Sequence, residues 1–86
     1  RYIPSLPKLI GNRFSNDSET FYYTILSEYY RNSSGHIVID CRNSFTGFMI
    51  QKNLYFDKNR QSYYIKGTRE DRPNNRGSKY KRFYLE

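Results

Sequence analysis

The 86-residue sequence has little of the residue types that build metal centres and disulfides. It contains one cysteine, one histidine and no tryptophan. Cys41 alone can form neither an internal disulfide nor a zinc site of several cysteines, and His36 is the only histidine. We therefore expect no metal and no cofactor. Because Cys41 shares a strand face with Ile37 and Ile39, we interpret it as a buried thiol rather than a nucleophile.

Long apolar segments and known catalytic motifs are also missing. No run of residues approaches the length of a membrane span. The Walker glycine loop, the HExxH motif and the Rossmann fingerprint are absent, so nucleotide-driven and metalloprotease chemistry have no support. The expected helix has no basic amphipathic face, and we therefore expect no membrane partner.

Positive charge and aromatic rings are what the sequence has in excess. Fifteen Lys and Arg residues stand against eight acidic residues, which gives a net charge of +7, and there are ten Tyr and six Phe. Such a charge attracts polyanions, nucleic acid above all, although a purely solubilising role is the alternative. The charge is concentrated at the end of the chain, because residues 66–86 contain seven basic and three acidic residues.

The sequence predicts one domain over residues 1–86 in the α+β class, with one main helix packed on an antiparallel sheet of about four or five strands. Residues 1–15 are expected to pack across the core as an arm. The helix is predicted in residues 16–34, because Asn16 and Glu19 have capping-box spacing and Gly35 follows the segment. Its apolar face would consist of Phe21, Tyr22, Ile25, Leu26 and Tyr29.

Alternating patterns after Gly35 predict the strands. His36 to Cys41, Gly47 to Gln51, Asn53 to Phe56, Ser62 to Gly67 and Ser78 to Glu86 each fit this description. A long basic loop is expected over residues 66–79, where arginines can grip phosphates bidentately. The alternative is a solvated loop whose arginines pair with Glu70 and Asp71.

The last strand alternates basic and aromatic side chains, which is typical of surfaces that bind single-stranded nucleic acid. We therefore predict a module that binds RNA or single-stranded DNA by electrostatic capture and aromatic stacking. At least half of the rings on the strands could instead form the core. The predicted binding residues are Tyr64, Lys66, Arg69, Arg72, Arg76, Lys79, Tyr80, Lys81, Arg82 and Tyr84.

Two alternatives use the same surface. Small basic toxin-type ribonucleases are similar in size and charge, and in such an enzyme His36, oriented by Asp40, would act as the general base. A protein-interaction domain for an acidic partner would instead use exposed Tyr and Arg as anchors.

Overall fold

In the computed structural model, which describes residues 9–72 and 80–86, the protein is an antiparallel sheet protein. The prediction of an α+β fold with about four or five strands was wrong, because the described residues contain eight strands, no α-helix and only one 3-10 turn, η1 (Arg69–Asp71). No helix in this part of the chain is long and apolar enough to cross a membrane. The strands are β1 (Arg13–Ser15), β2 (Tyr23–Ile25), β3 (Tyr30–Arg31), β4 (Ile37–Asn43), β5 (Met49–Asn53), β6 (Tyr55–Asp57), β7 (Ser62–Thr68) and β8 (Tyr80–Leu85).

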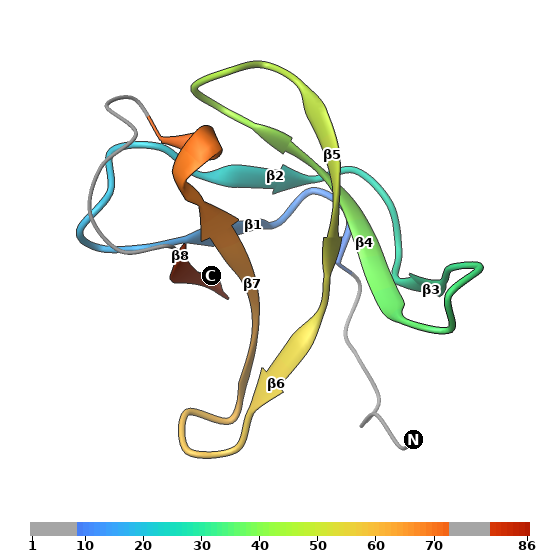
Figure 1. The fold of residues 1–86 in the computed structure, drawn as a ribbon. Helices are drawn as coiled ribbons and strands as arrows, with labels where there is room; N and C mark the ends of the chain where they lie inside the picture. Colours follow the sequence, from blue (N-terminus) through green and yellow to red (C-terminus); the bar gives the residue numbers. More distant parts are fainter. Residues whose placement is uncertain (1–8, 73–79) are drawn as a thin grey trace.

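The sheet curls into a half-barrel. Its strand order is β3-β4-β2-β1-β8-β7-β6, and β5 pairs with β4. Only Leu54 separates β5 from β6, so this nearly continuous segment joins the two margins of the curled sheet. Figure 1 shows the β4–β5 turn at one end of the molecule and the β6–β7 turn at the opposite end.

The segment predicted as a helix, residues 16–34, contains β2 and β3 instead. Phe21, Tyr23 and Ile25 are buried while Tyr22 and Thr24 between them are only partly buried, which is the period of two that a strand produces. The run of aromatic and β-branched residues favours a strand, and pairing of β2 with both β1 and β4 stabilises it.

The expected capping residues form turns. The side-chain oxygen of Asn16 accepts a hydrogen bond from the Ser18 N–H (2.8 Å), and the backbone carbonyl of Asn16 accepts one from the Glu19 N–H (3.0 Å). Asn and Asp side chains support such turns as readily as helix caps, so the spacing alone did not distinguish the two. Gly35 ends no helix. It lies in the β3–β4 turn at φ 87°, a conformation that suits glycine.

Each strand predicted after Gly35 overlaps an observed strand, and within the described residues the bounds differ by at most two residues. Lys66 and Gly67 lie inside β7, so the connection to β8 begins only after Thr68; residues 73–79 lie outside the described residues. In the expected arm, Arg13–Ser15 is strand β1, paired with β2 and β8, and residues 1–8 are not described.

One face of the curled sheet encloses the core. Phe14, Tyr23, Ile39, Ile65 and Phe83 are among its buried members. Cys41 belongs to the same cluster, and burial raises the pKa of its thiol to about 12, which agrees with the expected inert role.

A buried polar network connects β5 to the end of β7, two strands that do not pair in the described part of the sheet. The Asp71 carboxylate accepts hydrogen bonds from the Tyr23 hydroxyl (2.6 Å) and the Thr68 N–H (3.3 Å), and it pairs with Lys52 at 2.8 Å. The Asn43 side-chain amide donates to the Asp71 carbonyl (3.0 Å). Burial alone would raise the pKa of Asp71, but the bonds from Lys52 and Tyr23 hold it below its usual value.

Candidate nucleic-acid interface

The outer side of β6, β7 and β8 carries the three predicted rings together with two of the predicted cations, Lys66 and Arg82. In the β7–β8 ladder Tyr64 lies opposite Tyr84, and Lys66 lies opposite Arg82. Ile65, between Tyr64 and Lys66, points into the core, so the alternating residues point outward. We call this surface the tyrosine–cation face, and it consists of Tyr55, Arg60, Tyr64, Lys66, Tyr80, Arg82 and Tyr84.

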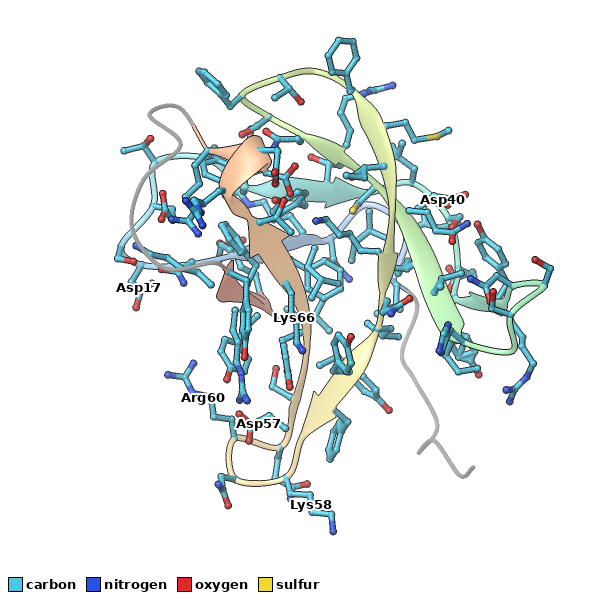
Figure 2. All side chains as sticks on the ribbon, in the orientation of Figure 1. Asp17, Asp40, Asp57, Lys58, Arg60 and Lys66 are labelled. Carbon is cyan, nitrogen blue, oxygen red and sulfur yellow. The ribbon has the colours of Figure 1, made fainter. Side chains whose placement is uncertain are left out.

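Lys66 lies between two rings of this face. Its ammonium nitrogen is 4.5 Å from the ring centroid of Tyr55 and 4.8 Å from that of Tyr80. A cation so placed over aromatic rings is stabilised by their quadrupoles and keeps its charge available to a ligand. Figure 2 shows Lys66 on β7, some distance along the strand from Asp57 and Arg60 at the β6–β7 turn.

Two arginines cover the other rings. The guanidinium carbon of Arg82 is 4.5 Å from the Tyr64 centroid, and that of Arg60 is 4.1 Å from the Tyr84 centroid. A stacked guanidinium leaves its edge N–H groups free to bind an anion in a fixed orientation. The face therefore alternates rings and cations across three strands.

The Asp57 carboxylate holds the part of the face that contains Arg60, Arg82 and Tyr84. It accepts hydrogen bonds from the Tyr84 hydroxyl (2.7 Å) and from Arg82 (3.1 Å). It also accepts the N–H groups of Asn59 (2.9 Å) and Arg60 (3.2 Å), which shapes the turn that carries Arg60. These bonds, that from Tyr84 first, hold the pKa of Asp57 below its usual value.

The tyrosines differ widely in what they can offer to a ligand. Tyr64 is only 8% exposed, and its ring lies against those of Tyr55 (5.3 Å between centroids) and Tyr84 (5.4 Å). Tyr84 is partly buried, whereas Tyr80 is 42% exposed. Of the three rings predicted to stack on bases, the structure leaves Tyr80 accessible and makes Tyr64 part of the packed surface.

The predicted cations are similarly divided. Lys81 pairs with Glu19 at 2.8 Å, and Arg82 pairs with Asp57 at 3.1 Å. Arg72 is 5% exposed, which withdraws it from the surface. Arg69 is exposed in η1. The two remaining predicted cations, Arg76 and Lys79, lie outside the described residues.

The predicted binding residues did not include Tyr55, Arg60 and Asp57. All three belong to the β6–β7 hairpin, where Tyr55 pairs with Tyr64. Continuing the alternation of the predicted strands across the turn would have placed Tyr55 beside Tyr64. Neither Arg60 nor Lys66 forms an ion pair with an acidic residue in residues 9–72 and 80–86. They are the cations that this face presents without a carboxylate partner there.

A shallow open hollow of about 290 Å³ borders the face. It is lined by Arg60, Arg82, Tyr84 and Leu85 together with residues 15–18. It is large enough to admit a phosphate group beside Arg60. The carboxylate of Asp17 at the rim opposes an anion there.

The structure does not bring together the residues expected to serve a ribonuclease. His36 is exposed in the β3–β4 turn, and its backbone N–H bonds to the side chain of Asn32. The Asp40 carboxylate accepts a hydrogen bond from the Tyr30 hydroxyl (2.8 Å) instead. Four residues along an extended strand span about 13 Å, so Asp40 cannot orient the His36 ring.

The described residues contain no group of three or more His, Cys, Asp or Glu side chains that could hold a metal ion. Comparison with known proteins adds no further constraint, because no protein-family model, no curated protein and no solved structure matches the chain significantly.

Proposed function

We propose that the protein binds single-stranded nucleic acid, RNA or DNA, along the tyrosine–cation face. One observation carries this proposal. Lys66 and Arg60 are held over tyrosine rings and have no carboxylate partner in the described part of the chain. Cations held in this way bind phosphates with little loss of side-chain entropy.

The division of labour differs from the one that the sequence suggests. Lys66 and Arg60 contact the phosphates, and Arg82 helps to position Tyr84 and Asp57. Tyr80, the accessible ring beside Lys66, stacks on an unpaired base. An unpaired strand fits better than a duplex because only its bases offer a free ring face.

The test is fluorescence anisotropy of a labelled single-stranded oligonucleotide over a series of salt concentrations. The wild type should bind with a steep salt dependence, since phosphate neutralisation releases counterions. Lys66→Gln should weaken binding and lower the slope of log K against log salt by about one. The recovered oligonucleotide is run on a denaturing gel to verify that it stays intact.

Lys58→Gln is the matched control, because it removes the same charge from an exposed lysine of the β6–β7 turn that is not one of the face residues. It should change the affinity less than Lys66→Gln does. Equal losses in the two variants would mean that attraction is spread over the whole protein and not located on the face. A wild type that fails to bind at low salt would refute the proposal, and a shortened oligonucleotide would point to a ribonuclease.

A further inference from the structure

The β4–β5 turn holds large apolar side chains out in water. Phe45 is 55% exposed, Phe48 is 74% exposed and Met49 is 66% exposed. Phe45 and Phe48 lie in the turn and Met49 is the first residue of β5. The turn lies at the end of the molecule opposite the β6–β7 turn (Figure 1). We call residues 43–49 the phenylalanine finger. A cluster of exposed apolar side chains marks a binding surface more often than a single one does.

Hydrogen bonds within the turn hold the finger in one conformation. The Asn43 side-chain oxygen accepts the N–H groups of Phe45 (2.7 Å) and Thr46 (3.2 Å), and its carbonyl accepts that of Gly47 (2.8 Å). The Phe48 N–H donates to the Thr46 hydroxyl (3.2 Å), and its carbonyl accepts the Asn43 N–H (3.1 Å). The exposure of the rings is therefore a property of an ordered turn.

The base of the finger is anchored to two other segments. The Ser44 N–H donates to the Tyr22 carbonyl (2.8 Å), and the Ser44 hydroxyl accepts the Tyr22 N–H (2.9 Å). The Asn43 side-chain amide donates to the Asp71 carbonyl in η1 (3.0 Å). A rigid support of this kind reduces the conformational entropy that the finger loses when a ligand binds.

The charge beside the finger is mixed, with an excess of cations. Arg42 is exposed and lies opposite Met49 in the β4–β5 ladder. Arg69 is exposed in η1, next to exposed Glu70. With a net charge of +7 on the whole chain, the surroundings favour an anionic ligand over a cationic one.

We propose that the phenylalanine finger stacks on unpaired bases of the same strand whose phosphates bind the tyrosine–cation face. The inference rests on the proposed function and completes it, because Tyr64 and Tyr84 are covered by cations and by each other. Phe45 and Phe48 are bare rings, and bases stack on such rings whatever their sequence.

The size of the protein permits a strand to reach both regions. The longest extent of the molecule is 36 Å. At the duplex spacing of about 3.4 Å per nucleotide this corresponds to about 11 nucleotides, which is within the range of about 4–16 nucleotides that a single OB-fold domain binds. An extended strand needs fewer nucleotides for the same distance.

The experiment compares a mixed-sequence oligonucleotide with an abasic one of the same length, which keeps the phosphates and lacks the rings. The wild type should bind the intact oligonucleotide more tightly. The Phe45→Leu/Phe48→Leu double variant should lose about fivefold to a hundredfold on it and little on the abasic strand. The salt slope should not change, because no charge is removed.

Tyr29→Leu is the matched control, since it removes a ring that is 41% exposed outside the finger and should leave both affinities unchanged. Circular dichroism and thermal melting verify that each variant folds. Equal losses on the intact and abasic strands, or no loss on either, would overturn the inference.

Failure of the inference and failure of the proposed function give different results. If the wild type binds both oligonucleotides with a steep salt slope and the double variant binds them with the same affinity, the finger does not contribute to binding. The proposal that the tyrosine–cation face binds the phosphates would then still hold. If the wild type binds neither, both proposals fall. If it binds phosphatidylserine vesicles, and the double variant loses that binding with unchanged oligonucleotide affinity, the finger contacts lipid and the inference is wrong.

Discussion

The tyrosine–cation face and the phenylalanine finger are both rich in aromatic rings, yet the rings differ in how far they are exposed. Tyr64 is 8% exposed beneath Arg82, whereas Phe48 is 74% exposed at the tip of a turn. On the face the rings support the cations, and on the finger the rings themselves are the accessible groups. The same aromatic and basic composition can therefore form two kinds of surface, one in which rings support cations and one in which the rings are accessible. A count of residues does not distinguish them.

The hydroxyl group explains part of the difference. The Tyr84 hydroxyl donates a hydrogen bond to the Asp57 carboxylate, which also accepts one from Arg82. The Tyr84 ring and the Arg82 guanidinium are therefore held by the same carboxylate. Phenylalanine has no such group, and the finger is ordered by its backbone and by Asn43 instead. The rings of the face should thus contribute to stability, while those of the finger should not.

The largest expected effect comes from the buried network around Asp71, which connects the finger to the end of β7. Lys52→Met leaves the Asp71 carboxylate buried without its cation, and the loss of one partner of a buried pair typically costs about 3–5 kcal/mol. Urea denaturation at neutral pH measures the change. The Asp71 backbone carbonyl also accepts a hydrogen bond from the Asn43 side-chain amide. The finger and the end of β7 should therefore loosen together.

Lys58→Met is the control for this variant, as it makes the same substitution at an exposed site. Surface changes of this kind usually stay within about 0.5 kcal/mol. The Lys52→Met/Asp71→Asn double variant should recover part of the loss, because the uncompensated charge is gone. A Lys52→Met protein as stable as Lys58→Met would show that the network does not hold the finger to the end of β7.

The second prediction compares one ring from each region. Tyr64→Ala should lower the free energy of unfolding by about 1.5–3 kcal/mol, the usual value of burying an aromatic side chain. Phe48→Ala should change it by less than about 0.5 kcal/mol, because the ring is already in water. Thermal and urea unfolding of the two variants measure both values. Similar losses would break the distinction between the face and the finger.

The strands were predictable where alternation and turn residues agreed. Residues 37–43 and 62–68 show this pattern and form β4 and β7. Residues 16–34 fit both a helical and an alternating pattern, because Phe21, Tyr22, Ile25 and Leu26 satisfy helical spacing as well as Phe21, Tyr23 and Ile25 satisfy a strand. Pairing of β2 with β1 and β4 decided between them, and that is a contact between distant residues.

The site was predictable only in part, for a related reason. The alternation in β8 correctly placed Arg82 and Tyr84 on one side of the strand with Tyr80. Whether a cation is paired depends on acidic residues far away in the sequence, such as Glu19 for Lys81 and Asp57 for Arg82. No local pattern contains this information, so the prediction could not separate paired cations from unpaired ones.

The smallest expected effect tests the hydroxyl anchor of the face. Tyr84→Phe removes the hydrogen bond that does most to lower the pKa of Asp57, so that pKa should rise towards its ordinary value of about 3.9. A carboxyl whose pKa is lower in the folded state contributes stability above its unfolded pKa and loses it as the pH falls through the folded pKa. The variant and the wild type should therefore differ at neutral pH and converge in acid.

Carboxyl carbon titration by NMR measures the pKa of Asp57 directly. Tyr30→Phe is the matched control, since it removes a hydroxyl that donates to Asp40 and should leave Asp57 unchanged. If Tyr84→Phe also leaves it unchanged, the Arg82 ion pair and the backbone N–H groups of the turn are enough to keep Asp57 ionised. The ring of Tyr84 would then be positioned by Arg60 and Tyr64 alone, and the hydroxyl could no longer explain why tyrosine occupies the face and phenylalanine the finger.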